Sequence, residues 1–179
     1  MIDFIKLKEE HLEQVLEWRT KESVTRFMYT DIDYNLDNQK RWFEKVSKMP
    51  TEKYWIISIK GNLAGVISLN DIDFTNRKTS WGFYIGEDNY RMYGGIIPQY
   101  LYNYVFNELN LNKITAEVME GNNNIIKIHK LHGYREVGYY KTHILKNGKF
   151  QDVHLMELLK EQWNHSSKKS EKYNNKFED

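Results

Sequence analysis

No cysteine occurs among the 179 residues of the chain. Without thiols there are no disulfides, no thiolate ligands for a metal and no cysteine nucleophile, which fits a reducing compartment. Long apolar runs are missing too, and no stretch approaches the roughly 18 residues of a membrane-spanning helix. The opening residues, MIDFIKLKEEHLEQ, carry charges early and lack the apolar core of a secretory signal. We therefore expect a cytoplasmic protein that has no membrane partner.

An excess of either charge is also absent. The chain carries 26 Lys and Arg residues against 25 Asp and Glu residues, so no large basic surface is expected and nucleic acid is excluded as a partner. Its length and its 40% hydrophobic content fit one domain with a core, which we place at residues 1–163. The remaining segment, residues 164–179, is polar apart from Tyr173 and Phe177, and we predict that it is a disordered tail.

Short apolar runs separated by turn residues predict a sheet. Gly61-Asn62 lies between two such runs, which indicates a β-hairpin, and a third run follows the turn-prone segment Asp73–Asn76, which indicates an antiparallel meander. Asn147-Gly148 is a strong signal for another hairpin. The expected strands are Ile2–Leu7, Tyr54–Ile59, Leu63–Leu69, Thr79–Ile85, Leu111–Met119 and the two that meet at Asn147-Gly148.

Apolar residues at helical spacing lie between these strands. The first predicted helix ends near Trp18 or Arg19, and the second is capped by Asp37 and ends before Pro50. Two more helices are expected, one opened by Gly94-Gly95 and one over Asn122–Leu131. Strand, helix and strand across residues 79–119 form a βαβ unit, so those two strands should be parallel. The expected fold class is α/β (α+β), with one mixed central sheet.

The turn between the third strand of the meander and the following helix could hold phosphate groups. Glycine lets the backbone turn tightly there, and the first amides of a helix have no partner within it. These amides and the helix dipole favour a pyrophosphate. The spacing excludes both a P-loop and a dinucleotide fingerprint, and a plain turn is the alternative interpretation. The segment is Arg91-Met92-Tyr93-Gly94-Gly95-Ile96.

Residues 81–134, from WGFYIG to KLHGY, resemble the GNAT superfamily of N-acetyltransferases. In that family an Arg/Gln-x-x-Gly-x-Gly/Ala loop follows a strand; Arg91 and Gly94 match it, whereas Ile96 stands where Gly or Ala is usual. A later block of the family places an Asn, a Tyr or His, and a Gly-Phe or Gly-Tyr pair at fixed spacing. Here the matching residues are Asn122, Ile126, His129, Gly133 and Tyr134. The resemblance extends over nearly the whole chain up to Trp163.

This resemblance implies that the chain takes acetyl-coenzyme A as its co-substrate. The sheet should be mostly antiparallel, flanked by helices, and splayed between its central parallel strands, where the pantetheine arm would lie. A backbone amide near Tyr84 or Ile85 would then polarise the thioester carbonyl. The other implied cofactor-binding residues are Arg91, Met92, Tyr93, Gly94, Gly95, Ile96, Asn122, Ile125 and Lys130.

Within the family the chain looks most like the enzymes of pseudaminic acid synthesis, which serve flagellin glycosylation. Those enzymes acetylate the 4-amine of a UDP-linked 4-amino-4,6-dideoxy sugar. The segments WRTKESVTRFMYT, GVISL and EVMEGNN carry this likeness. The chain also resembles the acetyltransferases of ribosomal-protein N-termini, and a non-catalytic domain that senses acetyl-coenzyme A is a second alternative. An exposed strand near the C-terminus could pair two copies of the chain.

Three residues are candidates for the chemistry of acetyl transfer. Strand alternation sets Glu117 on the face opposite Ile114, and the resembling sugar enzymes carry a glutamate here, so Glu117 is the candidate base. His129 stands where most of the family has a tyrosine that protonates the leaving thiolate, and an imidazole with a pKa of about 6.5 could act as acid or base. Ser68 could bond the acceptor. A solvated glutamate, a packed histidine and a structural serine are the alternatives.

The acceptor site should come from the N-terminal half of the chain, where large side chains precede the expected cleft. We expect Met28, Tyr29, Trp42 and Trp81 to pack against the acceptor, with ordinary core packing as the alternative. His129 and His132 are three residues apart, but no carboxylate has matching helical spacing, so we expect no metal site.

Overall fold

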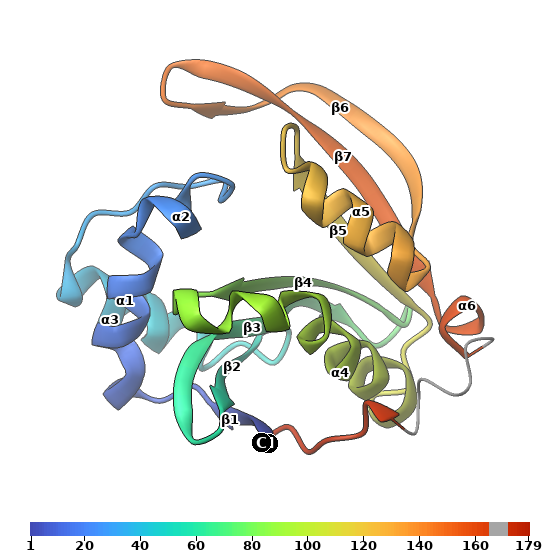
Figure 1. Cartoon of the computed structure of the whole chain (residues 1–179), viewed down its shortest axis with the longest axis horizontal. Helices are drawn as coiled ribbons and strands as arrows, with labels where there is room; N and C mark the ends of the chain where they lie inside the picture. The colour runs from blue at the N-terminus through green and yellow to red at the C-terminus, as the bar shows by residue number, and fades with distance from the viewer. Residues whose placement is uncertain (165–171) are drawn as a thin grey trace.

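The computed structural model describes residues 1–164 and 172–179 and contains a seven-stranded sheet with helices on both faces (Figure 1). The strand order is β1-β2-β3-β4-β5-β7-β6. Neighbouring strands are antiparallel except for the central pair β4 and β5, as the βαβ pattern predicted. The strands are β1 Ile2–Lys6, β2 Lys53–Ile59, β3 Asn62–Asp73, β4 Lys78–Ile85, β5 Lys113–Met119, β6 Arg135–Lys146 and β7 Lys149–Leu159.

Two apolar clusters attach the helices to opposite faces of the sheet. Leu12, Val15 and Trp18 of α1 pack with Ile56 and other β2–β3 residues on one face, and α3 joins them through Trp42 and Phe43. The other cluster joins α4 and α5 to the opposite face. The helices are α1 Leu12–Thr20, α2 Glu22–Thr25, α3 Leu36–Val46, α4 Ile97–Asn103, α5 Asn123–His132 and α6 Lys160–Asn164, with the 3-10 turns η1 Glu9–His11 and η2 Asp88–Gly95 and the π-helix η3 Tyr104–Glu108.

The central strands β4 and β5 separate soon after they pair. Their parallel register covers Lys78↔Lys113, Thr79↔Ile114 and Ser80↔Thr115, and the rest of each strand diverges (Figure 1). This confirms the predicted splay of the sheet.

Close packing fixes the residues that follow β4, beyond the point where the two strands diverge. A Cβ on Gly86 would lie 2.1 Å from the ring of Trp18, so only glycine lets α1 approach this closely. Trp18 Nε1 donates to Glu87 Oε1 at 2.6 Å, and Lys21 Nζ donates to the Gly86 carbonyl at 2.9 Å. The end of β4 is therefore held by Trp18 of α1 and by Lys21, the residue that follows α1.

The N-cap of α3 differs from the predicted one. Helix α3 begins at Leu36, because Asn35 rather than the predicted Asp37 is the N-cap, and its Oδ1 accepts from the Asn38 amide at 3.0 Å. Asn and Asp are both good caps, and the pattern alone could not rank two acceptors so close together. Asp37 lies instead in the first helical turn, where its charge favours the helix dipole.

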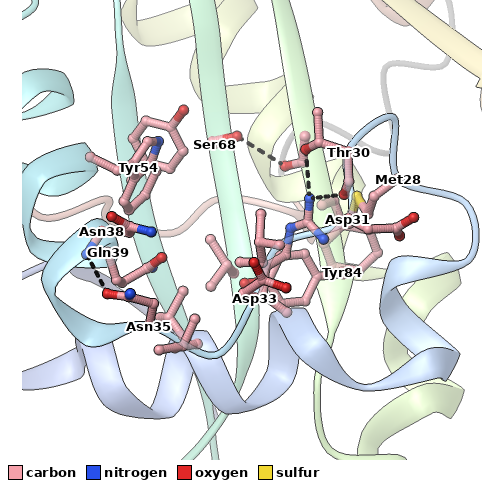
Figure 2. Close-up of a pocket in the computed structure, with 18 residues that line it drawn as sticks. Met28, Thr30, Asp31, Asp33, Asn35, Asn38, Gln39, Tyr54, Ser68 and Tyr84 are labelled. Carbon is pink, nitrogen blue, oxygen red and sulfur yellow. Dashed lines mark hydrogen bonds between the residues drawn. The ribbon is translucent and has the colours of Figure 1, made fainter. Parts of the chain in front are cut away.

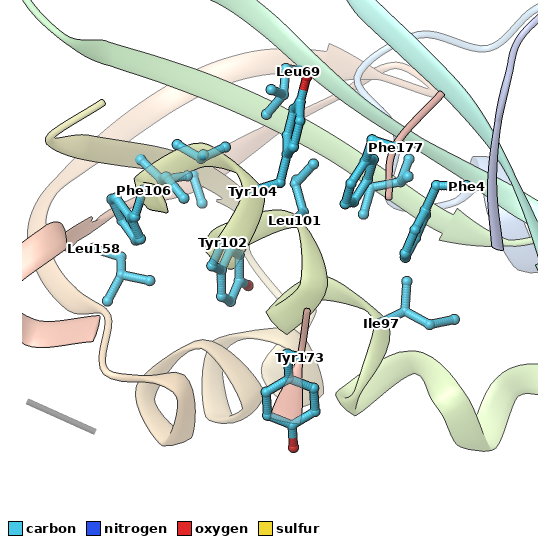
Figure 3. Packing of buried hydrophobic residues seen from close by; sticks show 14 of the residues in the cluster. Phe4, Leu69, Ile97, Leu101, Tyr102, Tyr104, Phe106, Leu158, Tyr173 and Phe177 are labelled. Atoms are coloured by element: carbon cyan, nitrogen blue, oxygen red, sulfur yellow. The ribbon is translucent and has the colours of Figure 1, made fainter. Parts of the chain in front are cut away.

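Residues 172–179 pack on the core, so the prediction of a disordered tail is wrong for them; residues 165–171 lie outside the described part. Phe177 is 3% exposed and stacks on Phe4 with ring centroids 4.1 Å apart (Figure 3). The Glu178 amide donates to the Phe4 carbonyl at 3.0 Å, and Trp55 Nε1 donates to the Glu178 carbonyl at 2.7 Å. Aromatic burial and an open strand edge outweigh the polar composition of the segment.

We predict that Phe177→Ala destabilises the protein by about 3 kcal/mol, because it removes a buried ring from a packed aromatic cluster. Phe74 is the matched control: it is 57% exposed, so Phe74→Ala should change the unfolding free energy by less than about 0.5 kcal/mol. Urea unfolding measures both. Equal, small effects would mean that the C-terminal segment does not contribute to the core in solution.

Candidate active site

A cavity of about 570 Å³ opens on the sheet face that α1 and α3 cover (Figure 2). Its walls come from α1, the segment before α3, α3 itself and strands β2 to β4. Of the predicted acceptor residues, Met28 and Trp42 line it, and so does Ser68. Ser68 is nearly buried, and its hydroxyl donates to Asn70 Oδ1 at 3.0 Å. The cavity therefore brings the predicted serine together with two of the four predicted acceptor residues.

Tyr29 lies outside this lining and contacts β5 instead. Its hydroxyl donates to Glu117 Oε2 at 2.6 Å, across 88 positions of sequence. Burial and the hydrogen bond to Glu117 raise the pKa of the Tyr29 phenol, so it stays protonated as a donor. A residue of the predicted acceptor site and the predicted base are thus direct partners.

The register of the split sheet sets Glu117 on the cavity side. Ser80 and Thr115 form the last parallel pair, and Gly82 and Glu117 each lie two residues beyond it. Side chains two apart on a strand share a face, so Glu117 projects from the same face as the cavity-lining Gly82. Gly82 pairs with Ser68 in the β3–β4 register. The cavity, Ser68 and Glu117 therefore belong to one side of the sheet.

Trp81 lies on the opposite side, so its assignment to the acceptor site is wrong. Its ring centroid is 5.4 Å from that of Tyr102 on α4 and 5.6 Å from that of His129 on α5. Strand alternation is the reason, because the Trp81 side chain points away from the face of β4 on which Gly82 pairs with Ser68. The sequence showed a large ring near the cleft but did not show to which side it turned.

His129 is 4% exposed and stacks on Tyr134 with ring centroids 4.7 Å apart. Its Nδ1 has no hydrogen-bond partner among the described residues. Burial, and to a smaller extent the neighbouring His132, lower the pKa of His129 to about 4. The ring is therefore neutral at pH 7, which corrects the expectation of a titration near 6.5 and leaves one N–H, not an imidazolium, for any role toward the leaving thiolate.

The predicted phosphate segment is more regular than a loop. Residues 91–95 belong to η2, and α4 begins at Ile97. A Cβ on Gly94 or Gly95 would meet no atom within 4 Å, so packing within the protein does not require glycine at either position. Arg91 pairs with Asp88 at 2.8 Å with both side chains exposed. Glycine here leaves an open face beside the start of α4.

Helix α5 supports this segment from behind. His132 Nε2 lies 2.9 Å from the Gly95 carbonyl, so this nitrogen carries the proton. Asn122 is the N-cap position of α5, and Ile125 is partly buried against the core. Lys130, a predicted cofactor contact, forms an ion pair with Glu136 at 3.5 Å. His132 was not predicted, since an inward histidine on a helix gives no sign of its partner.

Charged residues of the cavity were also missed by sequence reasoning. Arg19 lines it and donates through Nη2 to the Thr30 carbonyl at 3.0 Å, while burial lowers the pKa of its guanidinium. Asp31 accepts from Lys146 Nζ at 2.5 Å, which links the segment before α3 to the end of β6. Asp33 completes the charged lining. The sequence of one chain carries no signal that Asp31 and Lys146, which are 115 positions apart, are in contact.

Comparisons with known proteins identify the class of protein to which this chain belongs. The model of the acetyltransferase (GNAT) domain matches residues 5–155, so the chain belongs to that family. It is an acetyl-coenzyme A-dependent N-acetyltransferase whose acceptor is an amine. Among the described residues, no helix is both long and apolar enough to cross a membrane, and no three His, Cys, Asp or Glu side chains are grouped to hold a metal ion.

The relatives and the solved structures that match the chain carry different descriptions. The chain is 24% identical over 129 residues to the acetyltransferase PseH of Campylobacter jejuni, covering 72% of this chain and 79% of that one. It is 32% identical over 106 residues to YdaF of Bacillus subtilis, named provisionally as a ribosomal N-acetyltransferase, covering 58% and 57%. A Vibrio cholerae spermidine N-acetyltransferase, solved with CoA and spermine, shares the fold with a TM-score of 0.84 at 19% identity, covering 90% and 97%.

We predict that protonation of His129 destabilises the fold as the pH falls. The unfolded chain binds this proton near pH 6.5, whereas the folded state binds it with a pKa of about 4. The unfolded state therefore gains the proton first, so stability is complete above about pH 6.5 and is lost toward pH 4, by about 1.4 kcal/mol per pH unit. Between pH 6.5 and 4.5, His129→Phe should lose roughly 2 kcal/mol less than wild type.

Urea unfolding at the two pH values measures this difference. His143→Phe is the matched control, because His143 is exposed on β6 and its replacement should leave the pH dependence of wild type. The same pH dependence in wild type and His129→Phe would contradict a buried, neutral His129.

Proposed function

We propose that the acceptor is the 4-amine of a UDP-linked 4-amino-4,6-dideoxy sugar, acetylated by direct transfer in a ternary complex. The observation that carries this proposal is the cavity of about 570 Å³ beside the split of the sheet, which is large enough for a small-molecule acceptor. The resemblance of the chain to enzymes of pseudaminic acid synthesis supports the sugar nucleotide. The role in flagellin glycosylation is part of the same proposal.

The charges of the cavity argue against a polyamine acceptor. A chain of ammonium groups would need several carboxylates without cationic partners. Here Asp31 is paired with Lys146, and Arg19 lines the same cavity as Asp33. The formal charges are therefore nearly balanced, which suits a ligand that carries both an ammonium and phosphates. The likeness to the spermidine enzyme concerns the fold and does not extend to the acceptor.

A peptide acceptor is the alternative, and it is supported by the similarity to YdaF, which is named provisionally as a ribosomal N-acetyltransferase. An extended peptide would need an open groove lined by acidic side chains. This cavity is instead walled by α3 and the segment before it. Trp42 forms part of that wall. This shape favours a compact acceptor over a chain terminus.

The proposed chemistry uses the two faces of the split sheet. Glu117 takes a proton from the acceptor ammonium, directly or through water, while Tyr29 orients its carboxylate. Ser68 accepts or donates a hydrogen bond to the amine. The amine nitrogen forms a bond to the thioester carbon, whose oxygen is polarised by a backbone amide at Tyr84 or Ile85, and the bond to sulfur breaks. The nitrogen loses its second proton to water as the amide forms, and this proton balances the one that the thiolate takes up.

The thiolate then gains a proton on the opposite face, where His129 lies. Since His129 is neutral at pH 7, we propose that it offers a hydrogen bond and that water is the net proton source. The phosphates would lie at the exposed face beside the start of α4. The residues proposed to bind the coenzyme are Tyr84, Ile85, Arg91, Met92, Tyr93, Gly94, Gly95, Ile96, Asn122, Ile125 and Lys130.

Coenzyme A should stabilise the protein against heat, whereas NAD and ATP should not. A ligand that binds only the folded state stabilises it according to its concentration relative to its Kd, by about 2.7 kcal/mol at a hundredfold excess over Kd. Differential scanning fluorimetry with millimolar ligand measures the shift in Tm. No shift with coenzyme A would argue against a functional thioester site and would also exclude the alternative of a non-catalytic sensor.

Glu117→Gln should lower kcat/KM by about 10²- to 10³-fold, because the amide cannot take the proton of the ammonium. Thiol release with a panel of amines that includes a UDP-4-amino sugar measures this. Glu13→Gln on the exposed side of α1 is the matched control and should act like wild type. Full activity of Glu117→Gln would remove Glu117 from the mechanism, and its unchanged affinity for coenzyme A would show that the variant is folded.

Two further proposals concern self-association and cellular location. Two copies of the chain could pair through β6, an outer strand on which Val137, Tyr139 and Tyr140 are exposed. We also propose that the protein works in the cytoplasm.

A further inference from the structure

Helix α3 buries a polar residue where its pattern calls for an apolar one. The inward positions of this helix recur at spacings of three and four, and they are Leu36, Gln39, Phe43 and Val46. Three of the four are apolar and contact the core or its edge. Gln39 is the exception, at 7% exposed.

No side-chain hydrogen bond joins the Gln39 amide to another described residue, and its nitrogen and oxygen are not among the fully enclosed polar atoms that lack a partner, so the amide reaches the solvent of the cavity. A polar side chain on the inward face of a helix is unfavourable unless it is hydrogen-bonded, so this amide needs a partner from outside the protein, either water or a ligand. Gln39 lines the cavity, so its amide faces the volume that the proposed acceptor would occupy (Figure 2). A local rule broken at the wall of a binding cavity points to function.

The neighbouring groups suggest a flat partner. Trp42, one helical turn after Gln39, and Tyr54 on β2 also line the cavity, and their rings meet edge to face at 5.0 Å and 83°. Planar rings pack well against such aromatic walls. The amide of glutamine offers one acceptor and two donors, which match an edge that presents a carbonyl beside an N–H.

We propose that Gln39 binds the imide edge of a pyrimidine base, so that the α3 wall of the cavity is a uridine-nucleotide subsite. This inference rests on the proposed sugar-nucleotide acceptor and adds the part of the molecule that α3 recognises. An ammonium group carries donors alone and would be better served by a carboxylate, so the glutamine separates the two acceptor classes. Ser68 lines the same cavity on β3, beside the proposed reacting end.

Binding of UDP to the whole chain, measured by calorimetry with coenzyme A present, tests the subsite without any turnover. Gln39→Leu should weaken UDP binding at least tenfold and leave coenzyme A binding unchanged. Its Tm should stay close to that of wild type, because the substitution removes no side-chain hydrogen bond to a described residue. Gln39→Glu, which keeps the shape but loses both donors, should weaken UDP binding as well.

Gln14→Leu is the matched control, since Gln14 lies on α1 outside the cavity lining and bonds Glu17 at 3.0 Å. It should bind UDP like wild type. Absent UDP binding, or equal binding by wild type and Gln39→Leu, would overturn the inference. Thiol release with a UDP-4-amino sugar is scored separately: binding that depends on Gln39 without acetylation would reject the proposed acceptor alone, and acetylation that is indifferent to Gln39 would reject the subsite alone.

Discussion

The early separation of β4 from β5 is the constraint on which the rest of the structure depends. Three paired positions join the strands, and beyond them each strand follows a different partner. β4 stays with β3 and is held at its end by Trp18, whereas β5 continues with β7 down to Met119↔Val153. A sheet opened in this way leaves backbone groups of its central strands unpaired, and those groups need a ligand or water.

Two side-chain contacts cross from the first half of the chain to the strands beyond the split. Tyr29 reaches Glu117 on β5, and Asp31 reaches Lys146 at the end of β6. Both start from the segment between α2 and α3, so that segment is fixed by the C-terminal half that it faces. The carboxylate proposed as base is thereby oriented by a residue that the acceptor loop supplies, which couples the geometry of the acceptor site to the chemistry.

Polar side chains without a side-chain hydrogen bond to a described residue lie on both faces of the sheet: the Nδ1 of His129 is enclosed, whereas the Gln39 amide opens to the cavity. Burial keeps the His129 ring neutral at pH 7, so its contribution is one hydrogen bond near the leaving group. The Gln39 amide does not titrate, so it can donate and accept hydrogen bonds with a ligand at any pH. A protein that buries such groups gives up some stability for recognition, as sites commonly do.

The elements of the fold followed from local physics: apolar periodicity and turn residues predicted the strands and the parallel central pair, and the family resemblance implied the splay. Side-chain direction at a strand residue, the partner of a histidine and the packing of Phe177 needed the tertiary structure. Each depends on residues that are far apart in sequence. The Trp81 ring packs against Tyr102 and His129 on the face opposite the cavity, and Asp31 bonds to Lys146. By itself the sequence determined the family and its elements; the assembled sheet decided which residues share a site, because only folding brings distant side chains to one face.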